Sequence, residues 1–206
     1  MTGVPGIELR APSEADIDHV CRRLRALDRA EIFALRHGDG VDALIEDLVL
    51  HAPGFLELRA VAPAHAVHRA CGLVGLFPIR PHVAGALFFG TDELGALLRP
   101  LTRWIRRALI PRAQSRGLHR VEVQALESWR SSCRWIESLG AVREATLPLY
   151  GKAGETFVQF AWYGPRVDPR VTPEDDNDPA AEGDNDRKED TDVHLGTVRP
   201  QEVEAA

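Results

Sequence analysis

The stretch from residue 118 to residue 162 constrains the fold of this chain more than any other part of its sequence. It contains strand-like, helix-like, strand-like, turn and strand-like runs in that order, at residues 118–125, 128–139, 141–150, 151–154 and 156–162. Alternation of apolar and polar residues predicts half-buried strands, and apolar spacing near 3.6 predicts a helix. Gly140 follows the helical run and is expected to end it. The order predicts the closing half of a sheet that carries a helix on one face.

The upstream sequence adds a strand, helices, three more strands and one long helix. These runs lie at residues 7–10, 13–27, 29–35, 41–51, 55–62, 70–79, 84–90 and 94–116. Ser13 is expected to cap the first helix with its hydroxyl. Pro100 and Pro111 are expected to kink or split the long helix, because proline removes a backbone donor. The strand-rich first half favours an α/β fold of the α+β type, with a mixed sheet, over a doubly wound one.

Charge and aromatic residues divide the chain into two parts. The 206 residues carry a net charge of −6, and no Phe, Trp or Tyr follows Tyr163. Residues 165–206 hold 13 acidic and 5 basic residues, so the preceding residues have a net charge of +2. A highly charged segment without large apolar side chains cannot bury enough surface to offset its ordering entropy. We therefore expect a folded domain over residues 1–163 and a disordered acidic tail over residues 164–206.

The cysteines and the hydropathy pattern indicate a cytoplasmic protein. Cys21, Cys71 and Cys133 are widely spaced, and no CxxC or Cys/His cluster accompanies them. This spacing gives no reason to expect a zinc site, and reduced thiols are the simplest interpretation. The first residues lack the pattern of a signal peptide. No apolar run approaches the roughly 20 residues that a membrane-spanning helix needs.

The order of elements over residues 5–163 resembles the GNAT fold, that of acyl-CoA-dependent N-acyltransferases. The runs SCRWIESLGA (132–141) and GETFVQFAW (154–162) carry the resemblance in the C-terminal half. With FFGTDEL (88–94) they also resemble GNAT-like proteins of tailed phages, a group that includes internal virion proteins. The first resemblance implies a mostly antiparallel sheet flanked by helices, acetyl-CoA or another acyl-CoA as cofactor, and a small-molecule or protein amine as acceptor. The second implies a virion location and phage virion proteins as partners.

The GNAT resemblance places a cofactor site at the turn before the long helix. In that fold a glycine-containing turn presents backbone N–H groups to the CoA pyrophosphate. The corresponding candidates here are Gly90, Thr91, Gly95 and Ala96, with Arg99 and Arg103 in support. Asp92 and Glu93 oppose this assignment, because like charges about 4 Å apart cost on the order of 1–4 kcal/mol. The alternative is that Thr91 or Asp92 only caps the helix.

The catalytic groups implied by the resemblance are incomplete. The tyrosine that serves GNAT enzymes as general acid corresponds to Ile136, which has no proton to donate. Cys133 lies one turn earlier and is the candidate acid, although a buried core thiol is the competing interpretation. The candidate general bases are Glu93 and Glu122, followed by Asp92, Glu127 and His119. We therefore expect weak activity or none.

The long helix is rich in arginine, which leaves three interpretations open. Its arginines are Arg99, Arg103, Arg106, Arg107, Arg112 and Arg116. They could form a solvated basic face, hold the CoA 3′-phosphate, or bind an acidic partner. Nucleic acid is the least expected partner, because the folded part is nearly neutral. The sequence thus predicts a GNAT-like N-acyltransferase; the alternatives are a non-catalytic phage or prophage protein, acting as virion component or interaction module, and a nucleic-acid-associated protein.

Overall fold

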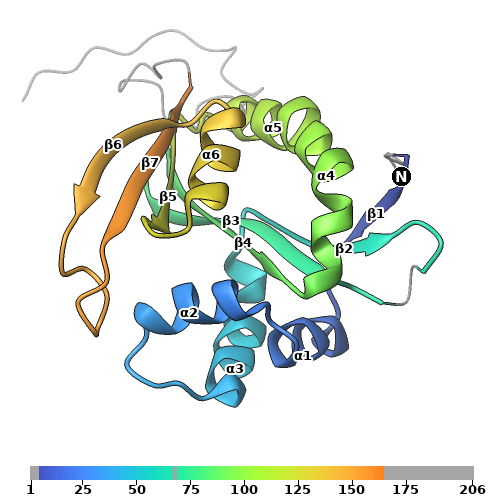
Figure 1. Ribbon diagram of the computed structural model, residues 1–206. Helices are drawn as coiled ribbons and strands as arrows, with labels where there is room; N and C mark the ends of the chain where they lie inside the picture. The colour runs from blue at the N-terminus through green and yellow to red at the C-terminus, as the bar shows by residue number, and fades with distance from the viewer. Residues whose placement is uncertain (1–4, 67–68, 165–206) are drawn as a thin grey trace, which may run out of the picture. The chain divides into compact units, whose positions relative to one another are not determined.

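A seven-stranded sheet is the centre of the computed structural model, which describes residues 5–66 and 69–164 (Figure 1). The strand order is β1-β2-β3-β4-β5-β7-β6. The strands are β1 (Ile7–Arg10), β2 (Glu57–Pro63), β3 (Gly72–Arg80), β4 (Val83–Gly90), β5 (Arg120–Leu126), β6 (Val142–Leu147) and β7 (Phe157–Tyr163). Only β4 and β5 pair in parallel, and every other pair in the sheet is antiparallel. The predicted fold class, a mixed and mostly antiparallel sheet with flanking helices, is confirmed.

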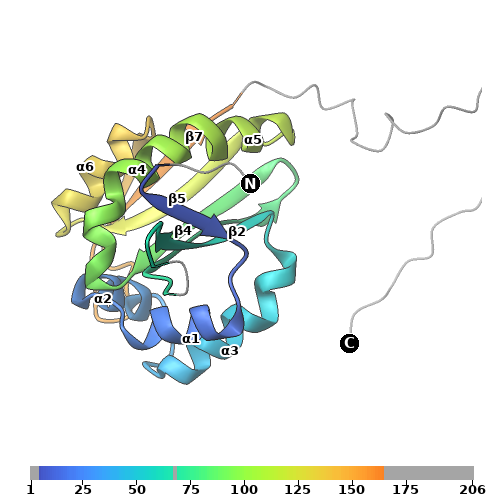
Figure 2. The ribbon, with the colours of Figure 1, turned by 90° about the vertical axis from the view of Figure 1, so that its right-hand side faces the viewer.

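Helices cover both faces of the sheet (Figure 2). One face carries α1 (Glu14–Arg22), α2 (Ala26–Ala34) and α3 (Val41–His51), which the short η1 (Ala52–Gly54) joins to β2. The other face carries η2 (Asp92–Leu97), α4 (Leu98–Trp104), η3 (Ile105–Leu109), α5 (Ile110–Ser115) and α6 (Arg130–Ser138). No helix in the described ranges is long and apolar enough to cross a membrane. The expected disordered tail lies outside the described residues.

The beginning of the first helix follows the sequence prediction. Ser13 is the N-cap of α1, and its hydroxyl accepts a hydrogen bond from the Asp16 N–H at 3.2 Å. The Asp16 carboxylate in turn accepts from the Ser13 N–H at 2.8 Å, which completes a capping box. Arg10 of β1 also pairs with Asp16, and together with the Ser13 hydrogen bonds it lowers the pKa of that carboxyl to about 2 against the effect of burial. The cap thereby fixes α1 to the strand that precedes it.

The predicted long helix is interrupted more often than its prolines alone suggested. It begins as the 3-10 turn η2, continues as α4, widens to the π-helical η3 and ends as α5. Pro111 lies in the first turn of α5, directly after η3. A proline ring clashes with the carbonyl four residues earlier, here that of Arg107 inside η3, and cannot donate to it. A local π-helical turn is a common way to absorb such a missing hydrogen bond.

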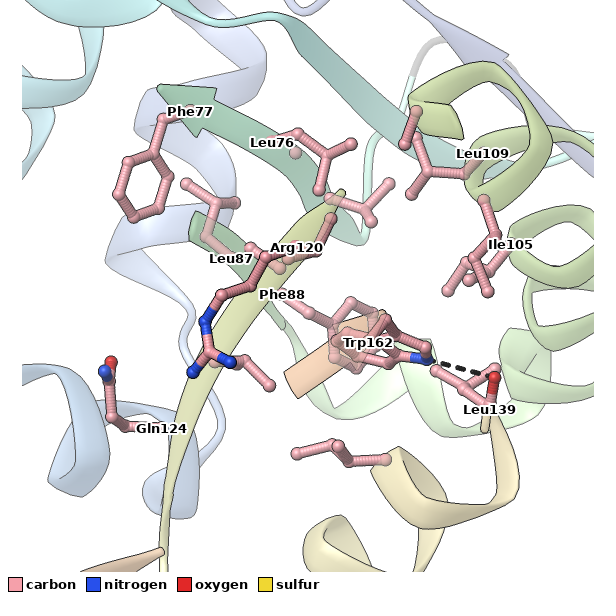
Figure 3. A pocket seen from close by; sticks show the side chains of 18 of the residues that line it. Leu76, Phe77, Leu87, Phe88, Ile105, Leu109, Arg120, Gln124, Leu139 and Trp162 are labelled. Atoms are coloured by element: carbon pink, nitrogen blue, oxygen red, sulfur yellow. Dashed lines mark hydrogen bonds between the residues drawn. The ribbon is translucent and has the colours of Figure 1, made fainter. Parts of the chain in front are cut away.

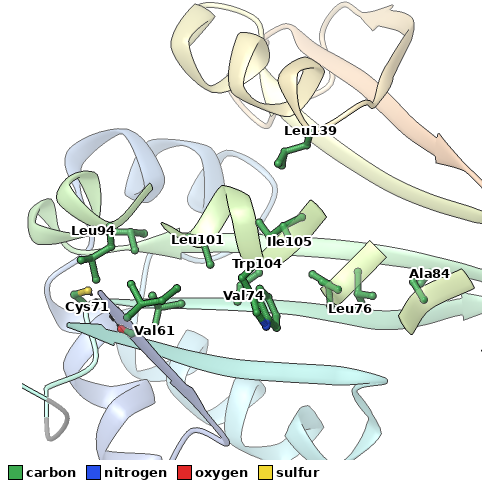
Figure 4. Packing of buried hydrophobic residues seen from close by; sticks show 14 of the residues in the cluster. Val61, Cys71, Val74, Leu76, Ala84, Leu94, Leu101, Trp104, Ile105 and Leu139 are labelled. Atoms are coloured by element: carbon green, nitrogen blue, oxygen red, sulfur yellow. Dashed lines mark hydrogen bonds between the residues drawn. The ribbon is translucent and has the colours of Figure 1, made fainter. Parts of the chain in front are cut away.

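The largest apolar cluster lies between the sheet and α4 (Figure 4). Side chains of β2, β3 and β4 meet the inner face of η2, α4 and η3. The cluster includes Val61, Val74, Leu76, Ala84, Leu94, Leu101, Trp104 and Ile105. Leu94 of η2 and Leu101 of α4 are fully buried, so both helical segments that follow the turn after β4 are anchored in the core. The position of the predicted cofactor turn therefore depends on this cluster.

Close packing accounts for one of the two glycines in that turn. A Cβ atom at Gly90 would lie 2.3 Å from the carbonyl oxygen of Cys71 and 2.5 Å from a methyl carbon of Leu94. At Gly95 a Cβ atom would meet nothing within 4 Å. The tight approach of β3 and Leu94 to the end of β4 thus requires a glycine at position 90. No packing contact requires one at position 95.

The two glycines should respond differently to alanine. Gly90→Ala forces a methyl group against the backbone of β3, and overpacking of this kind typically costs about 1–3 kcal/mol. Gly95→Ala enters open space in a helical turn and should be neutral, or stabilising by up to about 1 kcal/mol. Chemical denaturation of both variants beside the wild type measures the difference. Equal free energies of unfolding for the two variants would contradict this account of Gly90.

Candidate functional site

The two central strands separate after a short parallel ladder. β4 and β5 pair only where Val83, Ala84 and Gly85 face residues 120–122. Beyond this ladder β4 continues to its last residue with β3 on one side, and β5 continues with β7 on the other. From residues 86 and 123 onward, the facing edges of β4 and β5 have no ladder between them. The opening lies between the two strands at the middle of the strand order.

A cavity of about 340 Å³ lies at this opening (Figure 3). Its lining comes from both central strands and from helices on both faces of the sheet. It includes Glu31, Ile32 and Leu35 in and after α2, residues 86–89 of β4, Val121, Val123 and Gln124 of β5, Ile105 and Leu109 of η3, and Trp135, Ile136 and Leu139 in and after α6. Most of these side chains are apolar. The cavity is therefore reached by groups from either face at the point where the two strands part.

Two carboxylates of α2 hold the separated strands. The N–H of Gly90, at the end of β4, donates to Asp28 Oδ2 at 2.7 Å. The N–H of Leu126, at the end of β5, donates to Glu31 Oε2 at 2.9 Å. The N–H of Arg25 donates to the Gly90 carbonyl at 2.9 Å, so α2 meets the edge of β4 as another strand would. These contacts satisfy backbone groups at the far ends of β4 and β5, where buried polar groups need partners.

Asp28 is fully engaged in this contact. Both of its oxygens accept hydrogen bonds from the Arg25 guanidinium at 2.8 Å, in addition to the Gly90 N–H. Burial raises the pKa of Asp28, while the Arg25 hydrogen bonds and charge act in the opposite direction. The Arg25 guanidinium also lies over the rings of Phe88 and Trp129, at 5.9 and 5.3 Å. Asp28 therefore serves to position α2 on β4.

Glu31 differs from Asp28 because only one of its two carboxylate oxygens accepts a hydrogen bond from a described residue. Its Oε2 accepts from Leu126, and its Oε1 has no partner among the described residues. Burial raises the pKa of Glu31 to about 7, although the Leu126 N–H favours the charged form. The nearby Asp28 charge raises the pKa further and the Arg25 charge lowers it. Sequence reasoning missed Glu31, because nothing in its local pattern separates it from a surface acid of a helix.

The predicted general bases lie outside the cavity lining. Glu93 is exposed and pairs with Arg69 at 2.9 Å. Glu122 lies on β5 at the closed end of the opening, where its Oε1 accepts from Arg80 at 2.6 Å and from Arg120 at 2.7 Å. The Glu122 side chain is only 13% exposed. A catalytic role for either residue stays a prediction.

The predicted acid, Cys133, is a buried thiol of α6. It donates a hydrogen bond to the Leu126 carbonyl at 3.6 Å, and burial raises its pKa. Its neighbour Ile136 does line the cavity, at the position where the GNAT resemblance places a tyrosine. Of the two tyrosines in the chain, Tyr163 also lines the cavity, and its hydroxyl donates to Glu144. Cys133 does not line the cavity, which fits a core residue better than a proton donor at this opening.

The predicted cofactor turn is partly available. Thr91 occupies the N-cap position of η2, but its buried hydroxyl makes no cap and has no partner in the described part of the chain. The prediction that Thr91 or Asp92 caps the helix is therefore confirmed for the position of Thr91, but without a side-chain hydrogen bond. Gly95 and Ala96 are exposed. Asp92 is also exposed, and the carboxylate of Glu93 is engaged by Arg69.

The arginines of the predicted long helix divide into two groups. Arg112 and Arg116 pair with the buried Glu57 of β2 at 3.1 and 3.4 Å, so they fasten α5 to the sheet. The remaining four, Arg99, Arg103, Arg106 and Arg107, are exposed. The side chains of Arg112 and Arg116 stay 36% and 48% exposed, so the last turn is both solvated and held to the sheet. Arg99 and Arg103 stay the residues best placed to meet an anion beyond the η2 turn.

Trp135 connects α6 with α4 beside the cavity. Its indole N–H donates to the Thr102 hydroxyl at 2.9 Å. Its ring packs on that of Phe88, with centroids 4.6 Å apart and planes at 38°. Trp135 and Phe88 both line the cavity. A molecule that enters the cavity from the side of α4 and α6 would therefore contact this pair of rings.

The arrangement is that of the GNAT acetyltransferase fold. No protein-family profile and no curated protein matches the sequence. Solved structures do match. Ard1 from Thermoplasma volcanium matches with a TM-score of 0.60 at 16% identity, over 78% of this chain and 99% of that one. A variant of the spermidine N-acetyltransferase SpeG from Vibrio cholerae matches at 0.58 and 18%, over 77% and 94%. The protein yncA from Salmonella typhimurium, solved with acetyl-CoA, matches at 0.55 and 15%, over 82% and 98%.

The Glu31→Gln variant should gain stability relative to the wild type as the pH rises. Burial holds the pKa of Glu31 at about 7 in the folded chain, against an ordinary value of 4.5, so ionisation above pH 4.5 favours the unfolded chain. The free energy of unfolding of the wild type should fall by up to about 3 kcal/mol between about pH 4 and about pH 8 through this group. The amide does not titrate and can still accept from Leu126.

Equilibrium denaturation of the two proteins across that pH range measures the difference. Glu46→Gln is the matched control, because Glu46 is exposed on α3 and the change replaces a solvent-exposed carboxyl by an amide. The expected result is a gap between Glu31→Gln and wild type that widens with pH, and no such gap for Glu46→Gln. A gap for Glu31→Gln that does not depend on pH would contradict the assigned pKa.

Proposed function

We propose that this protein is an N-acyltransferase that takes its acyl group from an acyl-CoA. The observation that carries the proposal is the cavity at the opening between β4 and β5, lined from both faces of the sheet. An acyl donor and an amine can approach each other there from opposite faces. Structural neighbours support the class of reaction: SpeG is a spermidine N-acetyltransferase, and yncA was solved with acetyl-CoA.

Three features of the described residues suit an acyl-CoA. The edge of β4 beyond Gly85 has no strand partner on the cavity side, so its backbone can bond amides of an extended ligand. The Thr91 hydroxyl is buried without a partner at the turn that the resemblance assigns to phosphate. No acidic residue occurs between Glu93 and Glu122, and Arg99 and Arg103 are exposed beyond the turn. A bound acyl-CoA would supply an activated thioester carbonyl.

The negative charges at the turn weigh less than the sequence suggests. Glu93 is committed to Arg69, which offsets its charge at the surface. Asp92 is exposed, so water screens its effect on a neighbouring anion. The Gly90 and Thr91 N–H groups are already bonded to Asp28 and to the Cys71 carbonyl. In this proposal the β4 edge, the Thr91 hydroxyl and the exposed Gly95 and Ala96 hold the donor, and Arg99 and Arg103 meet its phosphates. The acceptor approaches from the face that α2 covers.

Binding of acetyl-CoA tests the donor site directly. Wild-type protein titrated with acetyl-CoA should give heat of binding, and the fluorescence of Trp135 should change because its ring lines the cavity. Gly95→Glu should abolish both signals, since it adds a carboxylate where there is open space and leaves the fold intact. Gly95→Ala is the matched control and should bind as the wild type does. No binding to a folded wild type at millimolar concentration would refute the donor site.

Turnover tests the missing general acid. We expect slow release of thiol from acetyl-CoA, because Ile136 has no proton for the leaving sulfur and a positioned acid typically contributes about 10²–10⁴-fold. Ile136→Tyr should raise the rate if it folds, which circular dichroism checks. Tyr163→Phe is the informative second variant, because Tyr163 is the tyrosine of the cavity lining. Fast wild-type turnover that Tyr163→Phe abolishes would show that the acid has been misplaced.

A non-catalytic role is the second candidate function, and two observations support it. Ile136 stands where an acid is expected, and Trp135 bridges α4 and α6 beside the cavity. A folded protein that binds acetyl-CoA in no variant and releases no thiol would favour an interaction module, of which the phage virion component is one form.

A further inference from the structure

We infer that Glu31 accepts the proton of the acceptor amine, and that this amine is carried on an apolar group. The inference rests on the proposed N-acyltransferase function. It assigns to α2 a chemical role beyond that of holding the strands apart. It also gives a substrate class: primary amines with a single positive charge and an apolar body.

Glu31 has a fixed carboxylate with one free oxygen at the cavity. Among the lining residues that the structure describes, it is the only acid. The Leu126 N–H holds Oε2 at 2.9 Å, and Oε1 has no partner in the described ranges. The contact to Leu126 orients the side chain toward the point where β4 and β5 have separated. A general base needs this combination of orientation and an available oxygen.

The other acids near the opening are already neutralised. Asp28 is bonded to Arg25 and Gly90. Glu122 is bonded to Arg80 and Arg120, and Arg120 also binds both oxygens of Glu144. The positive charge of Arg120, which lines the cavity, is thereby offset and does not repel an ammonium group. Glu31 is left as the carboxylate that an incoming cation would meet.

Acyl transfer from an acyl-CoA to an ammonium group moves two protons, forms one C–N bond and breaks one C–S bond. The ammonium form of the amine gives one proton to Glu31 Oε1, which passes it to solvent. The freed lone pair of the nitrogen forms the new C–N bond with the acyl carbon. The C–S bond breaks, and its electron pair leaves with the sulfur. A second proton leaves the nitrogen and reaches the sulfur through water, so each acyl transfer releases one proton overall.

The electrostatic surroundings of Glu31 suit this role near neutral pH. Burial places its pKa at about 7, close to the pH at which a general base is most effective. The charged groups that face it are Asp28 and Arg25 on its own helix, and Cys133 of α6 is the titratable group on the other side. Cys133 is a buried thiol with a raised pKa and stays neutral in this range. Below pH 7 Glu31 is mostly protonated, so transfer should fall as the pH decreases.

The cavity lining around Glu31 favours an apolar amine. Ile32 of α2 and Leu35, the residue after α2, line the cavity. Phe77 and Leu87 of the sheet line it as well (Figure 3). Apolar surface removed from water contributes about 25 cal/mol per Å² to binding. A second cationic group on the acceptor would find no further carboxylate among the described lining residues. An arylalkyl monoamine should therefore be preferred to spermidine, the acceptor of the structural neighbour SpeG.

The test combines a titration without donor and a pH–rate profile. The full-length protein labelled with ¹³C at glutamate carboxyl carbons is titrated by NMR, and the Glu31 signal is assigned with Glu31→Gln. We expect an apparent pKa near 7, and a shift of that signal on adding phenethylamine without acetyl-CoA. With acetyl-CoA present, kcat/KM for phenethylamine should follow the ionisation of that group. It should fall by about 10²–10⁴-fold in Glu31→Gln and stay unchanged in Glu46→Gln.

Each outcome separates this inference from the proposed function. If the wild type does not bind acetyl-CoA, the proposed function fails, whatever Glu31 does in the amine titration. If acetyl-CoA binds and transfer proceeds equally in Glu31→Gln, the role of Glu31 is overturned and the N-acyltransferase function stands. A Glu31 signal that titrates near 4.5 and ignores phenethylamine overturns the inference without any activity measurement. A kcat/KM for spermidine above that for phenethylamine overturns the substrate class.

Discussion

A pair of hydrogen bonds from one helix maintains the opening on which the site depends. Asp28 accepts from the end of β4 and Glu31 from the end of β5, and the two side chains lie one turn apart on α2. Buried backbone N–H groups at a break in a sheet need hydrogen-bond partners. Without α2, water or a shift of the neighbouring strand would have to supply them. Because α2 provides both partners from a single element, the ends of β4 and β5 are held apart with these N–H groups paired, while the edge of β4 before Gly90 stays without a strand partner. The cavity is the space that this arrangement keeps free.

Asp28 and Glu31 each accept a hydrogen bond from a backbone N–H, but their negative charges are compensated to different extents. Arg25 binds both oxygens of Asp28, so this carboxylate is held with its charge offset. Glu31 has only the Leu126 N–H, and burial raises its pKa to about 7, so it is only partly ionised at pH 7. The fold tolerates a carboxyl whose negative charge is only partly compensated, because removing Glu31 would leave the Leu126 N–H of β5 without a hydrogen-bond partner. A structural requirement and a suitable proton acceptor thus coincide in one side chain.

Local signals in the sequence predicted the elements well, and contacts distant in sequence decided the site. Strand alternation, the Ser13 cap and the helix end at Gly140 each depend on a few neighbouring residues, and the structure confirms them. The role of Glu31 depends on Leu126, 95 residues away, so no local pattern could reveal it. Gly90 resembled a phosphate-binding glycine but is required by the approach of Cys71. Residues that act through a remote partner lie beyond what one sequence discloses.

Side-chain packing also fixes the closed end of the opening, where the ladder between β4 and β5 ends. Phe77 of β3 pairs with Gly85, the last residue of β4 in the ladder with β5. A Cβ atom at position 85 would lie 2.2 Å from the Phe77 ring, so that ring occupies the space above the glycine. Phe77 also lines the cavity and packs edge-on against Phe55, with centroids 5.9 Å apart. A larger residue at 85 would displace Phe77 into the cavity, and the ladder therefore ends beside a glycine whose small size keeps the cavity open on the face of α2.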